Sequence, residues 1–160
     1  MPSSMPIKDA DGQLCIPNII NGSPEVLPTT SNFPVFSARK QTTLHYGQTA
    51  TVELTRKAAD AAAEAFKTYR KIPVHERYSM LLRAADLLEQ RAEEGVKRQM
   101  QETSCSEDWA KFNAMAATGT VRGIAAALHS AVKGEMQPSV MGNTSLVFKE
   151  PVGPVLIIPP

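Results

Sequence analysis

The last stretch of the chain, residues 150–160, constrains its fold most. From Val152 to Ile158 no charged residue interrupts a run that is rich in β-branched side chains. This composition is typical of a strand buried on both faces of a parallel sheet. Such a strand needs neighbouring strands, and a parallel neighbour needs a crossover of a dozen or more residues. No crossover follows Pro160 in this sequence. We therefore expect either an unpaired apolar strand or the front part of a larger protein.

The composition indicates a globular protein. A chain of 160 residues buries about two-thirds of its unfolded surface, and 42% hydrophobic with 21% charged residues is ordinary for such a chain. The formal net charge of +1 gives no reason to expect a nucleic acid or an anionic membrane as partner.

No apolar run reaches the ~18 residues of a membrane span, and the N-terminus lacks the pattern of a signal peptide. We expect a cytoplasmic protein. Cys15 and Cys105 lie far apart and lack the spacing of zinc ligands, so both are expected to be reduced thiols.

The first third of the chain has the pattern of extended structure. Residues 1–18 carry prolines and a turn-like cluster without periodicity, which predicts a loose leader. Residues 19–22, Ile-Ile-Asn-Gly, predict a strand that runs into a hairpin turn. Residues 33–46 predict a second extended stretch, broken by Ser-Ala-Arg-Lys.

Three long helices are predicted next, because apolar residues recur at spacings of three and four. The first begins at Thr51 and stops at Ile72-Pro73, the second covers residues 74–100, and the third runs from Ser104 or Ser106 to Gly134. The apolar stripe of the first helix consists of Leu54, Ala58, Ala62, Ala65 and Tyr69.

Three local signals refine the third helix and the segment after it. Residues 104–107, Ser-Cys-Ser-Glu, have the form of a capping box. Gly119 and Gly123 lie four residues apart within the helix, which favours close packing against another backbone over a membrane dimerisation motif. Residues 139–149 are extended again, with a turn at residues 141–143.

Several short sequence segments, in their order along residues 19–160, resemble the NAD(P)-dependent aldehyde dehydrogenase family. Residues 134–139 and Trp109-Ala110-Lys111-Phe112-Asn113 are similar to the branch that acts on aromatic aldehydes such as salicylaldehyde, benzaldehyde or vanillin. The other phrases that carry the resemblance are Ile-Ile-Asn-Gly at 19–22, Pro73, Arg77, Leu81, residues 84–91, Glu102-Thr103, and Glu-Pro-Val-Gly at 150–153 with the apolar run after it.

The resemblance implies an α/β fold and the N-terminal part of the cofactor domain. Its parts would be a β-hairpin, three long helices, an extended oligomerisation segment at residues 139–150, and the first strand of a Rossmann-like sheet. Ser104 occupies a position where the family has glycine, so the local turn is expected to differ.

The resemblance also implies a chemistry. The family oxidises an aldehyde by attack of a cysteine thiolate, transfers a hydride to NAD or NADP, and hydrolyses the thioester with the help of a glutamate. The nucleophilic cysteine, the glutamate and the asparagine that stabilises the oxyanion all lie downstream of the segment matched here. We therefore expect no catalytic residue in this chain and no activity from it alone.

Ile158, Pro159 and Pro160 match family positions that line the nicotinamide pocket. Their cofactor would be NAD or NADP. The competing interpretation is that they are buried strand residues, unless another chain supplies the rest of the pocket.

For the other candidate sites a structural role is favoured over a functional one. Cys105 at a helix N-terminus would be a reactive thiol, but its neighbours do not resemble the family's nucleophile segment, so a structural cysteine is favoured. No metal site is expected from the scattered histidines. The three histidines are His45, His75 and His129.

Two functions remain open. The first is an aldehyde dehydrogenase-like protein of the branch that acts on aromatic aldehydes, catalytically inactive by itself. The second is a non-catalytic module that oligomerises with itself or with a full-length aldehyde dehydrogenase, through a strand that adds to the edge of a partner's sheet. An aldehyde would then be bound only when another chain completes the site.

Overall fold

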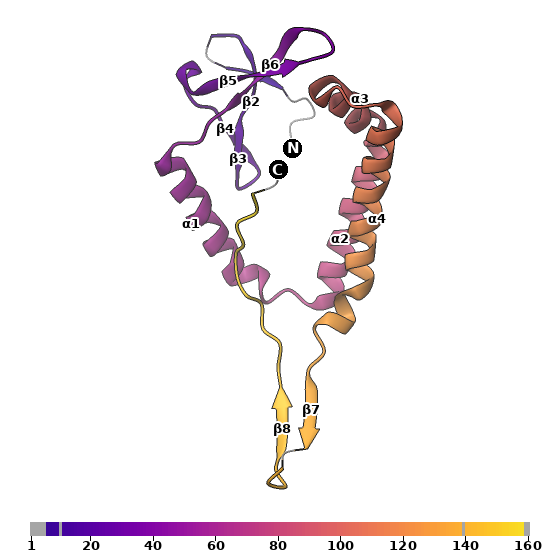
Figure 1. Ribbon diagram of the computed structural model, residues 1–160. Coiled ribbons are helices and arrows are strands. Elements are labelled where there is room, and N and C mark those ends of the chain that lie inside the picture. Colours follow the sequence, from indigo (N-terminus) through magenta and orange to yellow (C-terminus); the bar gives the residue numbers. More distant parts are fainter. Residues whose placement is uncertain (1–5, 10, 139, 159–160) are drawn as a thin grey trace.

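The computed structural model describes residues 6–9, 11–138 and 140–158, and it is an α/β arrangement (Figure 1). Short strands gather at one end of the molecule. Helix α1 descends on one side, and helices α2, α3 and α4 lie together on the other. A β-hairpin projects at the far end, and the chain then turns back toward the strands (Figure 1).

The main sheet has four strands in the order β1 (Ile7–Lys8), β2 (Leu14–Ile16), β6 (Thr42–Gln48) and β5 (Asn32–Ser37). Strand β2 runs parallel to β6, and the other pairs are antiparallel.

Strands β1 and β2 lie within residues 1–18, the expected loose leader. The sequence pattern missed them because each is only two or three residues long and β2 pairs with a strand distant in sequence. Cys15 at the centre of β2 is fully buried, so this part of the leader belongs to the core.

The hairpin turn predicted at residues 19–22 is confirmed, and the extended stretch predicted at residues 33–46 falls within a second hairpin. Strands β3 (Asn18–Ile20) and β4 (Ser23–Glu25) are antiparallel, and the turn between them has positive φ angles of 52° at Asn21 and 74° at Gly22. Strands β5 and β6 form the second hairpin. A short 3₁₀ turn, η1 (Thr29–Ser31), leads into β5.

The first predicted helix is confirmed as α1 (Val52–Tyr69), in which the side chain of Thr51 accepts a hydrogen bond from Leu54 N at 3.1 Å. Of the predicted apolar stripe only Leu54 is buried. The main contact of helix α1 is with strand β3, because α2, α3 and α4 lie across the open centre of the molecule (Figure 1).

The second predicted helix is two helices. Helix α2 (Val74–Gln90) ends and α3 (Ala92–Thr103) begins at Arg91, whose backbone angles of −102° and 9° leave the helical region. The single helix predicted over residues 74–100 is therefore wrong. The break turns α3 so that it packs against both α4 and β5, a tertiary contact that the local pattern does not contain.

The third predicted helix is confirmed as α4 (Glu107–Ala131). Ser106 rather than Ser104 is the N-cap, since its side chain accepts a hydrogen bond from Trp109 N. Ser104 instead ends α3 in the left-handed region at φ 59°. Gly119 and Gly123 have open space where a Cβ atom would lie, so the predicted close packing is not present in the described residues.

The segment after α4 forms an antiparallel hairpin of β7 (Glu135–Pro138) and β8 (Thr144–Val147). Its first strand therefore precedes the extended stretch predicted over residues 139–149, of which residue 139 lies outside the described residues. The predicted buried strand at 152–158 does not form. Within the described part of the chain no strand pairs with these residues, and Val152, Leu156 and Ile158 are 93%, 83% and 83% exposed.

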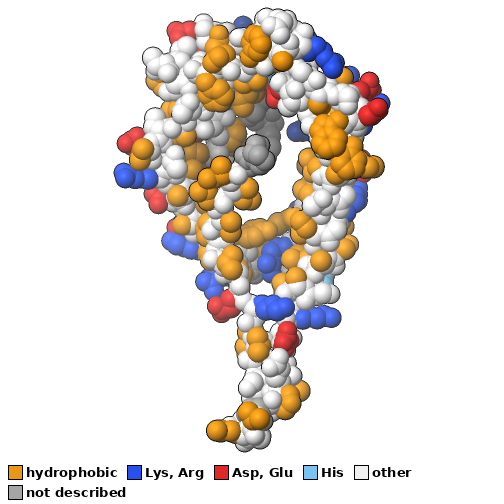
Figure 2. Space-filling model, in the orientation of Figure 1, with side chains coloured by type: hydrophobic (Ala, Val, Ile, Leu, Met, Phe, Trp, Pro, Cys, Tyr) orange, Lys and Arg blue, Asp and Glu red, His pale blue; other side chains and the backbone are white. Residues whose placement is uncertain are grey.

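The molecule exposes far more surface than a compact one. Its accessible surface is 11845 Å², whereas a compact monomer of 17.3 kDa exposes roughly 7,800 Å². Figure 2 shows an opening through the molecule with hydrophobic side chains along its border. None of the described helices is both long enough and apolar enough to cross a membrane.

Candidate functional site

The predicted cofactor residues lie at the end of the chain. Ile158 belongs to a segment without regular structure, and 83% of its surface is exposed. Pro159 and Pro160 lie outside the described residues. Ile158 thus presents an apolar surface and no charge, and the assignment of these three residues to a nicotinamide pocket stays a prediction.

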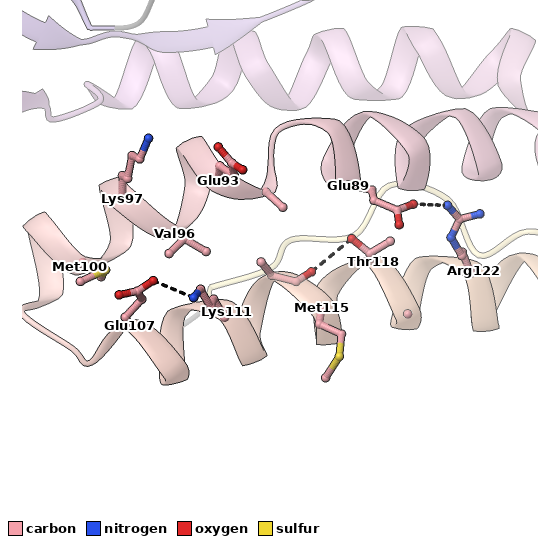
Figure 3. A pocket seen from close by; sticks show the side chains of 13 residues that line it. Glu89, Glu93, Val96, Lys97, Met100, Glu107, Lys111, Met115, Thr118 and Arg122 are labelled. Atoms are coloured by element: carbon pink, nitrogen blue, oxygen red, sulfur yellow. Dashed lines mark hydrogen bonds and ion pairs between the residues drawn. The ribbon is translucent and has the colours of Figure 1, made fainter.

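The larger candidate site is an open groove of about 840 Å³ between α3 and α4 (Figure 3). Val96 and Met100 project from α3 toward α4, and Glu107 and Lys111 lie opposite them on α4 (Figure 3). The lining residues are Glu89, Ala92, Glu93, Val96, Lys97, Met100, Glu107, Lys111, Ala114, Met115, Thr118, Gly119 and Arg122.

Ion pairs neutralise much of the charge along this groove. Lys111 Nζ lies 2.7 Å from Glu107 Oε1, and Arg122 Nη2 lies 2.7 Å from Glu89 Oε2. The hydrogen bond from Lys111 lowers the pKa of Glu107, and the same bond raises the pKa of Lys111. The pKa of Arg122 is raised, first by its hydrogen bond to Glu89. These shifts favour the ionised forms of Glu107, Lys111 and Arg122, so none of the three is suited to act as an acid or a base near neutral pH.

Arg122 also pairs with Asp86 of α2, at 2.9 Å. One guanidinium therefore ties α4 to α2 beside the groove. The sequence analysis did not single out Arg122, because its partners lie 33 and 36 residues away.

Cys105 lies between α3 and α4 and is partly buried. Its backbone N–H donates to Thr103 Oγ1 at 3.4 Å, and its carbonyl accepts from Arg39 Nη2 at 3.3 Å. In the described part of the chain no hydrogen bond links its thiol to a base. The geometry agrees with a structural cysteine, and both Cys15 and Cys105 are free thiols.

The histidines lie apart. His45 Nε2 is 3.4 Å from Glu102 Oε1, while His129 makes an edge contact with Tyr78 at a ring distance of 5.7 Å. Among residues 6–9, 11–138 and 140–158, no three His, Cys, Asp or Glu side chains come together in a way that could hold a metal ion.

Trp109 and Phe112 form a stacked aromatic pair near the start of α4. Their ring centroids are 5.6 Å apart with planes inclined by 26°, and the residues are 56% and 51% exposed. Both residues belong to the segment at 109–113 that resembles the aromatic-aldehyde branch. Their spacing of three residues was the signal that the two rings would meet.

Of the β7–β8 hairpin, β8 lies within residues 139–150, the segment expected to mediate oligomerisation, whereas β7 precedes that segment. All eight strand residues of the hairpin are exposed, among them Met136 at 74% and Leu146 at 60%. The role of this segment in oligomerisation stays a prediction.

The chain is similar in sequence to enzymes that act on aromatic aldehydes. It is 38% identical over 112 residues to a salicylaldehyde dehydrogenase of Pseudomonas putida, and 38% identical over 112 residues to a vanillin dehydrogenase of Pseudomonas sp. strain HR199. Each match covers 69% of this chain and 23% of the relative. The matched segment is thus about a quarter of the length of those relatives.

Solved structures give the same fold. The crystal structure of a salicylaldehyde dehydrogenase from Pseudomonas putida G7, complexed with salicylaldehyde, matches 87% of this chain and 29% of its own with a TM-score of 0.80 and 28% identity. An NAD-dependent benzaldehyde dehydrogenase from Corynebacterium glutamicum matches 75% of this chain and 26% of its own with a TM-score of 0.69 and 22% identity.

A family model covers most of the sequence. The model of the aldehyde dehydrogenase family matches residues 26–160. The match begins directly after β4 and continues through helices α1 to α4 and the C-terminal segment. The chain belongs to the aldehyde dehydrogenase family.

Proposed function

We propose that this chain serves the NAD(P)-dependent oxidation of an aromatic aldehyde to its carboxylic acid, as the N-terminal part of the enzyme's fold. The observation that carries the proposal is the 38% identity to both a salicylaldehyde and a vanillin dehydrogenase. Both of these relatives are named for aldehydes on an aromatic ring.

The stacked pair of Trp109 and Phe112 supports an aromatic substrate. Its exposed ring surface is of the kind on which another aromatic ring packs in an offset or edge-on arrangement. In this proposal the pair helps to bind and orient the aldehyde, and it performs no bond-making step.

NAD or NADP is the proposed hydride acceptor. Benzaldehyde dehydrogenase is one structural neighbour described as NAD-dependent, and a glyceraldehyde-3-phosphate dehydrogenase complexed with NADP is another. Ile158 fits a role as an apolar contact for a nicotinamide ring, because its side chain is exposed and uncharged. Pro159 and Pro160 would extend that contact.

The reacting groups are proposed to come from outside these 160 residues. Cys105 is held in a structural junction, and in the groove between α3 and α4 Glu107 and Glu89 are paired with Lys111 and Arg122. The excess of exposed surface is then the surface that the rest of the enzyme covers. The proposed location of the protein is the cytoplasm.

A second proposal is a non-catalytic module that binds a full-length aldehyde dehydrogenase. The exposed β7–β8 hairpin favours it, since a two-stranded ribbon can add to the edge of another sheet. The module would act by association, without turnover of its own.

A chimera separates the two proposals. Residues 26–160 replace the matching segment of the Pseudomonas putida salicylaldehyde dehydrogenase, and NADH formation from salicylaldehyde is followed by absorbance. The first proposal expects an active chimera and an inactive isolated chain. A folded but inactive chimera, together with co-purification of the isolated chain and the full-length enzyme, would reject it in favour of the module.

A further inference from the structure

A small open pocket lies on the surface between helix α3 and the turn that joins β5 to β6. The turn covers residues 38–41, and the pocket has a volume of about 200 Å³. Three of its six lining side chains carry a positive charge and none carries a negative charge. The lining residues are Ser37, Arg39, Lys40, Lys97, Met100 and Gln101.

The three cations of this pocket come from two separate elements. Arg39 and Lys40 lie on the turn, and Lys97 projects from α3. Figure 3 shows the Lys97 side chain on the side of α3 that faces away from α4, so its ammonium group points away from the larger groove. The fold thus brings to one pocket positive charges that are more than fifty residues apart in sequence.

The positive charge of the pocket is not neutralised by the protein. Among the described residues no ion pair joins a carboxylate to Arg39, Lys40 or Lys97. Glu93 lies one helical turn before Lys97, but it does not line this pocket. Like charges around one pocket repel each other, and a bound anion replaces that repulsion by attraction. The pocket is therefore suited to an anionic ligand.

Hydrogen bonds to the end of α3 hold the turn in place. Ser37 Oγ donates to the carbonyl oxygen of Gln101 at 2.6 Å. Arg39 N donates to Ser104 Oγ at 3.0 Å. Arg39 Nη2 donates to the carbonyl oxygen of Cys105 at 3.3 Å. Because these bonds fix the backbone of the turn and one arm of the guanidinium, binding a ligand there costs less conformational entropy.

The donors of the pocket match a phosphate group better than a carboxylate. A guanidinium has five N–H donors, and the bond to Cys105 uses only one of those of Arg39. The ammonium groups of Lys40 and Lys97 add further donors to the pocket. A phosphate monoester carries about 1.5 to 2 negative charges near pH 7 and has three acceptor oxygens. A carboxylate has one charge and two oxygens, so it satisfies fewer of these donors.

We propose that the pocket between the turn and α3 binds a phosphate group, either as the free ion or as the phosphate of a small monoester. Arg39 supplies N–H donors and charge from a fixed position, and Lys40 and Lys97 supply the remaining charge. Met100 offers an apolar contact to the group that carries the phosphate in a monoester. The site shares no lining residue with Ile158 or with the stacked rings of α4, and it stands independently of the proposed aldehyde chemistry.

Isothermal titration calorimetry on the full 160-residue chain, in a buffer free of phosphate, tests the site. The probes are inorganic phosphate, phenyl phosphate and acetate. We expect saturable one-to-one binding of a phosphate probe, weakened about tenfold when sodium chloride is raised from about 50 to about 500 mM. Tighter binding of phenyl phosphate identifies a monoester as the ligand, tighter binding of inorganic phosphate identifies the free ion, and either result supports the site.

The pocket variant is Lys40→Gln with Lys97→Gln, which leaves the bonds of Ser37 and Arg39 in place. Its matched control is Lys71→Gln with Lys133→Gln, which removes the same charge from exposed positions after α1 and α4. Because the pocket variant loses two charge-assisted hydrogen bonds to the ligand, we expect binding about tenfold weaker or less. The control variant should bind the phosphate probes as the parent does.

Three results would overturn the proposal: no saturable binding of either phosphate probe by the parent, acetate bound as tightly as phosphate, or equal weakening in both variants. Far-UV circular dichroism checks that the helices are intact. If the pocket variant loses them, the exposed single change Lys97→Gln is measured instead, and an unchanged affinity there equally rejects the site. None of these measurements involves aldehyde oxidation, so the site and the proposed function fail separately.

Discussion

The indole ring of Trp109 stacks on the ring of Phe112 at 5.6 Å, one helical turn along α4. Both residues are about half exposed. Exposed stacked rings on a rigid helix lose little side-chain conformational entropy when they bind a further ring, because each side chain has only two rotatable angles. This pair is therefore the described feature that best matches an aromatic ligand.

Trp109→Ala in the chimera is expected to raise KM for salicylaldehyde about 3–10-fold. The reason is that an aromatic contact contributes about 0.5–1.5 kcal/mol beyond its buried area, and about 1.4 kcal/mol is tenfold. Steady-state kinetics with salicylaldehyde and with a short aliphatic aldehyde provide the measurement. An equal loss for both aldehydes would argue against ring recognition, and Phe36→Ala, an exposed aromatic on β5, is the control.

Ser106→Ala is expected to destabilise the fold by about 0.5–2 kcal/mol, since the N-cap of α4 loses its acceptor for Trp109 N. The corresponding fall in Tm is about 2–6 °C. Thermal unfolding by circular dichroism measures it. Ser130→Ala near the other end of α4 serves as the control, and an equal effect of both changes would contradict the assigned cap.

The two thiols are expected to react at very different rates. Cys15 is fully buried, and burial, followed by the negative charge of Asp9, raises its pKa. The folded state thus holds this proton more tightly than the unfolded chain does. Its contribution to stability is complete below the pKa of an unfolded cysteine and is lost as the pH rises through the folded pKa.

Timed alkylation at neutral pH, followed by mass spectrometry of the peptides, measures both thiols in one sample. Cys105 should be modified first, and Cys15 only when denaturant unfolds the sheet. Equal rates in native buffer would show that β2 is not packed in the core.

The segment at 152–158 is expected to make the isolated chain self-associate. Val155 and Ile157 are 68% and 78% exposed, and an exposed apolar stretch without charges favours contacts between molecules. Ile157→Lys should shift the sedimentation profile toward monomer at a given concentration. Ser130→Lys adds the same charge elsewhere and should not; a monomeric parent chain would contradict this prediction.

Much of the fold could be predicted from local patterns. The turn at Asn21 and Gly22 and the start of α1 at Thr51 follow from the conformations that those residues adopt locally. The helical spacing of apolar residues likewise predicted α4, because that spacing is a local property of the sequence. The resemblance to the aldehyde dehydrogenase family then identified the family to which the chain belongs.

The features that were missed depend on contacts distant in sequence. The break at Arg91 has no local breaker residue and is set by the packing of α3 on α4 and β5. Strand β2 exists because Cys15 and its neighbours pair with β6. The predicted strand at 152–158 failed for the converse reason, since its composition is that of a strand but no neighbour pairs with it.

The most direct test of the account is the kcat/KM of the chimera for salicylaldehyde, with the isolated 160-residue chain assayed beside it. We predict measurable NAD-dependent oxidation by the chimera, with salicylaldehyde preferred over a short aliphatic aldehyde, and no turnover by the isolated chain. Turnover by the isolated chain, or a correctly folded chimera that oxidises the aliphatic aldehyde and not salicylaldehyde, would contradict the account.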